Sequence, residues 1–228
     1  ILTFYGFLGF SQGNEKELLA QEYMNAGQYD KAIVLFEEIY SKNSSTYIYD
    51  SYLECLLKTE DWKAAEKLIQ KHKRNNPLIP RFYVDEGYVQ LLQNNIKQSD
   101  KIFNDAIKWA ISSEQLIIDL SNAFQIRELN NWAIQTLSAG KKQFPQSTTL
   151  KIQLAGLYMK AGKYSEMLDE YFILLENPFF GVEELQKHIQ SLLMEDRDGQ
   201  ISITFKNKLL EKIQKYPSNP DYNRLLVW

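Results

Sequence analysis

Structural landmarks recur along this chain of 228 residues at a nearly constant step of 34, and this period constrains the fold more than any single motif does. A position that favours small residues recurs, at spacings of 33, 34, 34 and 34, at Ala20, Leu53, Gly87, Ser121 and Ala155. A helix–turn–helix period of this length is typical of repeats that stack, because one hairpin cannot bury its apolar face alone. The period therefore predicts an all-α chain, an α-solenoid of antiparallel helix hairpins.

Three further landmarks keep the same register. The turn between the helices is expected at Gly27, Glu60, Asn94, Glu128 and Gly162. A second small position is found at Ala32, Ala65, Ser99, Ala133 and Met167, and a large one four residues later at Phe36, Ile69, Phe103, Leu137 and Tyr171. Small residues let two helices approach closely, and large ones fill the space between successive hairpins. We expect these small and large positions to be buried.

Local signals also indicate where helices begin and end. Asp30, Asp61 and Asn131 stand where an N-cap of the second helix in a unit would be, accepting hydrogen bonds from unpaired backbone N–H groups. Gly27 and Gly162 suit a turn with a positive φ angle, which costs glycine little.

The residues around these landmarks share a recognisable pattern. It consists of an aromatic residue three after the small one, Gly-x-Tyr at the turn, and a closing proline, as in Ala20 and Tyr23, Ala155 and Tyr158, Gly27 and Tyr29, Gly162 and Tyr164, Pro77, Pro145 and Pro217. The pattern resembles the tetratricopeptide repeat (TPR), which implies a right-handed superhelix of stacked hairpins. Five repeats are expected within residues 13–181, at 13–46, 47–79, 80–113, 114–147 and 148–181. The third and fourth depart most, with Gln90, Asn94, Glu128 and Asn130 where the family prefers aromatic residues or glycine.

The first twelve residues differ from the repeats. Residues 1–10 are apolar and uncharged, and Gly9 and Ser11 form a small-x-small pattern before the charged segment 14–17. This is the form of a signal-peptide core followed by a cleavage site, with the mature chain beginning near Gln12. The combination with helical repeats resembles exported TPR proteins of Gram-negative, Bacteroidetes-like bacteria, which implies a periplasmic location. A short membrane anchor is the alternative.

The C-terminal part is expected to be atypical. A sixth helical hairpin is predicted within residues 182–217, with helices at about 182–195 and 203–216 and a loop at 195–199. Residues 218–228 have the register of the first helix of a further, truncated repeat. Its apolar face, Leu225, Leu226 and Trp228, is expected to lack a hairpin partner and to fray.

Composition argues against several classes of protein. A net charge of −3 is unlike the basic stripe of a nucleic-acid binder, and the short stretch Lys71-His72-Lys73-Arg74 is interpreted as a solvated helix end. The single cysteine, Cys55, cannot form an intrachain disulfide and is expected to be buried.

Neither a metal site nor a catalytic site is expected. Asp196-x-Asp198-Gly199 resembles the centre of a calcium loop, but Met194 and Phe205 occupy the positions of its terminal ligands. We therefore interpret it as an Asp-Gly turn. His72 and His188 have no nucleophile motif beside them and are expected at the surface or in the groove wall. No cofactor is expected.

A binding surface remains as the candidate site. The resemblance implies that the first helices line a concave groove, whose exposed positions are predicted to be Glu17, Gln21, Met24, Tyr47, Asp50, Glu54, Arg81, Val84, Tyr88, Ile118, Asn122 and Gln125. The set does not reproduce the lysine and asparagine clamp with which some members of the family hold a C-terminal carboxylate. Tyr47, Tyr49, Tyr52, Phe82, Tyr83 and Tyr88 are candidates to anchor a peptide, with packing between repeats as the alternative, above all for Tyr49, Tyr52 and Tyr83.

The sequence thus predicts a non-enzymatic scaffold that binds a protein or peptide partner of unknown identity. It predicts no nucleic-acid partner, and membrane contact only through the possible N-terminal anchor. The alternative is an adaptor or sensor arm of a larger protein whose enzymatic or signalling domain lies beyond residue 228.

Overall fold

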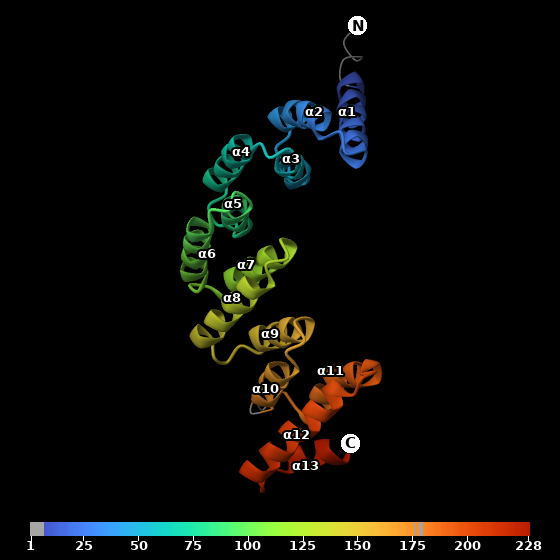
Figure 1. The fold of residues 1–228 in the computed structure, drawn as a ribbon, viewed down its shortest axis with the longest axis vertical. Coiled ribbons are helices and arrows are strands. Elements are labelled where there is room, and N and C mark those ends of the chain that lie inside the picture. The colour runs from blue at the N-terminus through green and yellow to red at the C-terminus, as the bar shows by residue number, and fades with distance from the viewer. Residues whose placement is uncertain (1–6, 176, 178–179) are drawn as a thin grey trace. The chain divides into compact units, whose positions relative to one another are not determined.

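The computed structural model describes residues 7–175, 177 and 180–228, with side chains from residue 15 onward (Figure 1). Over those residues the chain forms thirteen α-helices and no strand. The helices are α1 (Phe7–Asn25), α2 (Tyr29–Lys42), α3 (Thr46–Lys58), α4 (Trp62–Asn75), α5 (Arg81–Leu92), α6 (Ile96–Ala110), α7 (Glu114–Ile126), α8 (Asn130–Gln143), α9 (Thr148–Lys160), α10 (Tyr164–Leu174), α11 (Val182–Glu195), α12 (Gln200–Lys215) and α13 (Pro220–Val227).

Two compact units make up the chain, unit 1 at Ile1–Asn104 and unit 2 at Asp105–Trp228, and each is described by itself. In unit 1, α2 packs against α1 and α3, and α4 packs against α3 and α5. In unit 2, α8 packs against α7 and α9, α10 against α9 and α12, and α12 also against α11 and α13. Helices therefore pack chiefly on their neighbours in sequence, as stacked hairpins require.

The predicted core register is confirmed by burial. Every landmark that we expected in the core is buried, from Ala20, Leu53, Gly87, Ser121 and Ala155 through Ala32, Ala65, Ser99, Ala133 and Met167 to Phe36, Ile69, Phe103, Leu137 and Tyr171. The approach is closest at Gly87, where a Cβ atom would lie 2.2 Å from Cε1 of Phe103. A larger residue at this position of α5 would displace the aromatic ring, so the third repeat uses glycine to seat α6.

The turns confirm the register independently. All five predicted turn residues have left-handed backbone angles, with φ of 70° at Gly27, 57° at Glu60, 63° at Asn94, 58° at Glu128 and 68° at Gly162. The same pair of hydrogen bonds closes each of the five turns. In the first turn, Gly27 N–H donates to Met24 O at 3.0 Å, and Gln28 N–H donates to Tyr23 O at 2.8 Å. These two bonds define a Schellman motif, which satisfies carbonyls left unpaired at the end of the first helix.

Two of the three predicted helix caps are wrong. Asp61 does cap α4, accepting from Ala64 N–H at 3.1 Å. However, Asp30 lies in the first turn of α2 and Asn131 is the second residue of α8, behind the N-cap residues Gln28 and Leu129. The caps lie earlier than predicted because the link between the two helices of a hairpin is short. The residue that ends each Schellman motif also serves as the N-cap of the next helix.

The C-terminal helices share an apolar cluster of their own. Tyr222 and Leu225 of α13 are each 2% exposed and join the core that includes Phe172, Phe205 and Leu209. The expectation that Leu225 lies bare is therefore wrong, and the apolar residues of this segment that remain exposed are Leu226, Val227 and Trp228. Tyr222 is the residue that anchors the helix and that the sequence argument overlooked.

At the N-terminus, residues 7–12 of the apolar segment belong to α1, whereas residues 1–6 lie outside the described part. The signal-peptide assignment stays a prediction. None of the helices over the described residues combines the length and apolar character needed to cross a bilayer.

Candidate interaction surface

The predicted groove residues lie on the first helices of the hairpins, and most keep part of their surface accessible. Tyr47 is 53% exposed, and Asn122 is also exposed. The partly buried members are Glu17, Gln21, Met24, Asp50, Glu54, Arg81, Tyr88, Ile118 and Gln125. Val84 is fully buried, so its prediction as a groove residue is wrong, because its side chain has no surface open to solvent.

A small hollow lies between α1 and α3 in unit 1. Glu17, Leu18, Gln21 and Tyr47 line it, around a volume of about 230 Å³. The phenol of Tyr47 donates a hydrogen bond to Oε1 of Gln21 at 3.1 Å, which ties the ring to α1. Two predicted groove residues of α1, Glu17 and Gln21, and one of α3, Tyr47, therefore line the same hollow.

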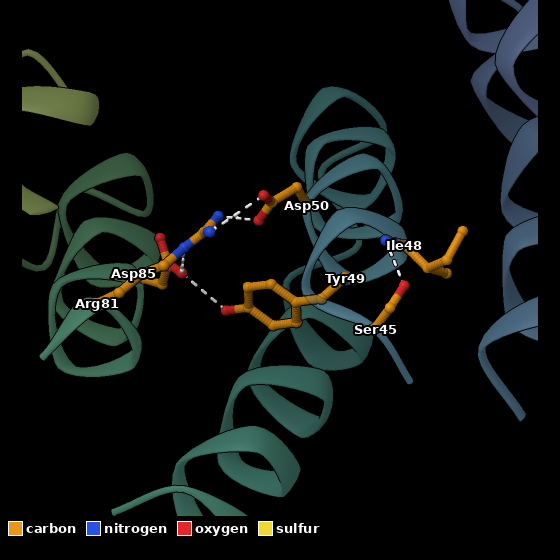
Figure 2. Close-up of polar contacts among 6 residues, drawn as sticks. All are labelled: Ser45, Ile48, Tyr49, Asp50, Arg81 and Asp85. Atoms are coloured by element: carbon orange, nitrogen blue, oxygen red, sulfur yellow. Dashed lines mark hydrogen bonds and ion pairs between the residues drawn. The ribbon is translucent and has the colours of Figure 1, made fainter. Parts of the chain in front are cut away.

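A polar network joins α3 to α5 in the same unit (Figure 2). The guanidinium of Arg81 forms a two-pronged ion pair with Asp50, and its Nε lies 3.6 Å from Oδ2 of Asp85. Asp85 is only 2% exposed and accepts from the Tyr49 hydroxyl at 2.8 Å. Two of the predicted groove residues thus neutralise each other, and this bidentate pair fixes the spacing of the two helices.

His72 is buried beside Tyr49 of that network, not at the surface or in the groove wall as predicted. The ring is 6% exposed and packs among Tyr40, Tyr49 and Phe82, with centroids 5.4, 4.3 and 5.0 Å away. Its Nε2 atom is buried and has no hydrogen-bond partner. Burial, aided by the charge of Lys71, lowers the pKa of His72, so the neutral imidazole is the folded form.

The tyrosines divide between core and surface. Tyr49 and Tyr52 are buried, as the packing alternative predicted, and burial raises the pKa of Tyr52 to about 12. Tyr83 is partly buried and donates to the carbonyl of Pro77 at 2.9 Å. Tyr88 is partly buried against the core of unit 1, so Tyr47 is the tyrosine of this group that presents most of its ring to a partner.

A second hollow in unit 1 was not predicted. Its volume is about 240 Å³, and its walls come from α4, α5 and α6 at Glu66, Ile69, Gln70, Glu86, Gln90, Gln98 and Ile102. Its polar groups pair with each other, since Gln90 donates to Glu66 at 2.8 Å and Gln70 donates to Glu86 at 2.8 Å. The signal in the sequence was Gln90, which departs from the aromatic residue preferred in the repeat.

In unit 2, two of the three predicted positions, Asn122 and Gln125, carry amides, and the third is Ile118. Gln125 donates to Oδ1 of Asn122 at 3.4 Å and accepts from Lys160 of α9 at 3.5 Å. Ile126 at the end of α7 is 65% exposed. This surface offers amide and aliphatic groups in place of the carboxylates and tyrosine of unit 1.

The end of unit 2 contains a larger apolar groove between α11, α12 and α13. It has a volume of about 600 Å³, and its lining includes Leu193, Met194, Phe205, Leu226 and Trp228. Met194 is 80% exposed and Trp228 is 49% exposed. The sequence analysis anticipated exposed apolar residues here, but not a groove built by three helices.

The loop at 195–199 is a capped turn. Asp196 accepts hydrogen bonds from the backbone N–H groups of Ile201 and Ser202 and from the Ser202 hydroxyl, at 3.1, 2.7 and 2.6 Å. The hydrogen bond from the Ser202 hydroxyl is the main cause that lowers the pKa of Asp196. The backbone of Gly199 has a positive φ of 71°, as expected of an Asp-Gly turn. The carboxylate is thus engaged in starting α12. Among the described residues no group of three acidic, histidine or cysteine side chains is arranged for a metal ion.

The remaining chemically active side chains are engaged in packing. Cys55 is fully buried, as predicted, and burial raises the pKa of its thiol to about 11. His188 stacks on Tyr171 and Phe180 at centroid distances of 5.5 and 6.0 Å. The Nε2 atom of His188 lies 3.8 Å from Oε1 of Glu184, one turn earlier on α11.

No protein-family model matches the chain, and no curated protein matches it in sequence. The similar solved structures include TTC0263, a thermophilic TPR protein of Thermus thermophilus, with 16% identity, 80% of this chain and 99% of that chain covered, and a TM-score of 0.39. MamA (41-end) from Desulfovibrio magneticus RS-1 has 13% identity, with 72% and 93% covered and a TM-score of 0.38. The TPR2AB-domain:pHSP90-complex of yeast Sti1 has 9% identity, with 95% and 98% covered and a TM-score of 0.38.

These TM-scores are all below 0.5, so the assignment of the fold rests on the hairpins themselves. The repeated core positions, the five Schellman turns and the packing of neighbouring helices define the chain as an all-α protein of TPR-like helical hairpins, as predicted.

Proposed function

We propose that this protein is a non-enzymatic scaffold that binds a partner protein or peptide on the exposed faces of the first helices of its hairpins. The observation that supports the proposal most directly is the use of the repeated unit. Each of the five repeats buries the same small and large positions, and the first four leave the predicted positions of their first helices at least partly accessible, with Val84 as the exception. Repetition of this kind produces an extended surface without an enclosed catalytic cavity.

We further propose that the protein works in the periplasm after export. The support is the apolar, uncharged run at residues 1–10, which ends in the small-x-small pattern of Gly9 and Ser11 and is followed by a charged segment. Mass spectrometry of the protein isolated from its native cells provides the test. A mature N-terminus near Gln12 is expected, whereas peptides that extend through residues 1–11 in the mature protein would contradict cleavage.

Site-specific photocrosslinking tests the binding surface. A photoreactive phenylalanine analogue is placed at Tyr47, Asn122 or Gln125 on first helices, and at the exposed positions Val34 and Gln135 on second helices as matched controls. Irradiation in cells should give the same discrete adduct from the first-helix positions, and mass spectrometry then identifies the partner. Equal adducts from Val34 and Gln135 would contradict a surface confined to the first helices.

A further inference from the structure

The hollow between α1 and α3 has the dimensions of a single side chain. Its volume is about 230 Å³, whereas sites for drug-sized molecules usually occupy roughly 300–1,000 Å³. It is open to solvent at Tyr47 and at Leu18, which is 66% exposed. A side chain projecting from a partner can therefore enter it without rearrangement of either helix.

Glu17 gives the hollow a negative charge that no residue of the described chain neutralises. Its carboxylate is partly exposed and forms no hydrogen bond or ion pair with a described residue. The basic residues of these two helices are engaged elsewhere, since Lys16 pairs with Glu38 of α2 and Lys58 lies 3.6 Å from Glu54. The position thus favours a cation supplied from outside.

The other walls suit the stem and head of a long basic side chain. Because the Tyr47 hydroxyl is bonded to Gln21, the ring is held with about half of its surface accessible. A guanidinium or ammonium group is attracted to the face of such a ring, and its methylene stem packs on aliphatic groups such as Leu18. Carboxylate, aromatic ring and aliphatic surface together select a basic side chain over an acidic or a purely apolar one.

We propose that this hollow receives a lysine or arginine side chain, so that the partner segment bound by unit 1 is basic. The proposal rests on the scaffold function above and specifies the chemistry of its partner. It agrees with the first helices of unit 1 as a group, because α1, α3 and α5 contain seven acidic and three basic residues. Arg81, the basic residue of α5, is already paired with Asp50.

Fluorescence anisotropy with defined peptides tests this inference. The probe is a fluorescein-labelled ten-residue peptide of alternating arginine and serine, compared with peptides that contain citrulline or glutamate in place of arginine. Citrulline keeps the shape of arginine but is uncharged, so the comparison isolates the cation. The intact 228-residue chain should bind the arginine peptide at least about tenfold more tightly than the citrulline peptide, with a preference that weakens as salt increases.

Matched variants of α1 locate the effect. Glu17→Gln should remove most of the preference for arginine, and Tyr47→Leu should weaken binding of the arginine peptide several-fold. Glu22→Gln removes the same charge from an exposed position of α1 outside the hollow and should change binding less than about twofold. Circular dichroism shows whether each variant keeps its helical fold.

Two results would overturn the proposal. Equal losses in Glu17→Gln and Glu22→Gln would mean that net charge alone attracts the peptide. Failure of the arginine peptide to bind, or equal binding of the citrulline peptide, would mean that the hollow does not hold a cation. In either case adducts from Tyr47 and Asn122 would still show a scaffold, so failure of this inference is distinguishable from failure of the proposed function.

Discussion

The two units share one hairpin design but present different chemistry on their first helices. In unit 1, α3 and α5 are joined by the Arg81–Asp50 ion pair, and Glu17 and Tyr47 shape a hollow between α1 and α3. In unit 2, α7 and α9 contain two acidic and two basic residues, and the predicted positions are Ile118 and the amides of Asn122 and Gln125. The first helices of unit 1 thus carry a net negative charge, whereas the acidic and basic residues of α7 and α9 balance.

The polar contacts that connect successive hairpins also differ. In unit 2 two ion pairs lie on second helices, where Lys141 of α8 pairs with Glu170 of α10, and Lys208 of α12 pairs with Asp169 of α10, and a third joins Arg224 of α13 to Glu183 of α11. In unit 1 the Arg81–Asp50 pair lies on the first helices, within the candidate surface. On the predicted surface, therefore, α3 and α5 are joined by an ion pair, whereas α7 and α9 are joined by the long contact of Lys160 with Gln125 and, at their N-terminal ends, by the hydrogen bond that Ser147 donates to Glu114. An ion pair between helices preorganises the surface of unit 1 for binding.

Overpacking the cores should have the largest effect and should be the same in both units. Ala32→Trp in unit 1 and Ala133→Trp in unit 2 place a large ring where no surface is accessible, at a cost of about 3 kcal/mol or more. Thermal melts followed by circular dichroism measure the loss. The controls are Val34→Trp, at a position 66% exposed, and Gln135→Trp at an exposed position of α8. An unchanged melt for either core variant would show that the register is wrong in that unit.

Acid should destabilise the protein through unit 1 because of His72. Burial lowers the pKa of this imidazole, so the unfolded chain binds the proton first, near pH 6.5. The free energy of unfolding should therefore be highest above about pH 7 and fall below pH 6.5, by at most about 1.4 kcal/mol per pH unit.

Denaturant titrations between about pH 7.5 and 5 measure this dependence. His72→Phe, which suits a pocket formed by Tyr40, Tyr49 and Phe82, should flatten it. The matched substitution His188→Phe in unit 2, where the ring already stacks on Tyr171, serves as the control for replacing a histidine by phenylalanine. A slope that survives in His72→Phe would assign the acid sensitivity to other groups.

The sequence predicted most of the fold because the period reports on packing volumes. Burial of Phe36, Phe103 and Tyr171 follows from a spacing that places each against the same neighbour in its own hairpin. The left-handed turns at Glu60 and Glu128 were located by the same spacing, although neither residue favours that conformation. The caps were misplaced because helix propensity does not reveal that one residue can end one helix and begin the next.

The candidate site was less predictable, since exposure depends on neighbouring helices that the period does not specify. Val84 and Tyr88 belong to one helix face, yet Val84 is fully buried whereas Tyr88 is partly exposed. His72 looked solvated because it lies between lysines, but its ring turns into the aromatic cluster with Tyr49. The negative charge at Glu17 could not be predicted from the sequence, because only the structure shows that Lys16 pairs with Glu38 and not with the adjacent Glu17.

Substitutions in the turns should have intermediate effects of opposite sign. Glu60→Gly in unit 1 and Glu128→Gly in unit 2 relieve a left-handed conformation that costs other residues roughly 1–2 kcal/mol, partly offset by greater entropy of the unfolded chain. A net gain of about 0.5–1 kcal/mol is expected in urea titrations.

The reverse change tests the same strain. Gly162→Ala should cost about 1 kcal/mol, although a Cβ atom there would meet nothing within 4 Å. As a control, Lys63→Gly at an exposed position inside α4 should destabilise by about 1 kcal/mol. If Glu60→Gly and Lys63→Gly were equally destabilising, backbone strain at the turn would be refuted.

The smallest effect concerns the contrast between the two surfaces. Arg81 and Asp50 are 23% and 41% exposed, so water screens their attraction and their coupling should be only about 0.5–1 kcal/mol despite the bidentate geometry. A double-mutant cycle with Asp50→Asn and Arg81→Gln measures this coupling without counting the separate contact of Arg81 with Asp85. The matched cycle in unit 2, Asn122→Ala with Gln125→Ala, spans a hydrogen bond of 3.4 Å within one helix and should give less than about 0.3 kcal/mol. Equal couplings would mean that unit 1 is no more preorganised than unit 2. The Asp50–Arg81 pair joins two helices, α3 and α5, and so restricts how they can move when a partner binds, whereas the Asn122–Gln125 bond lies within one helix.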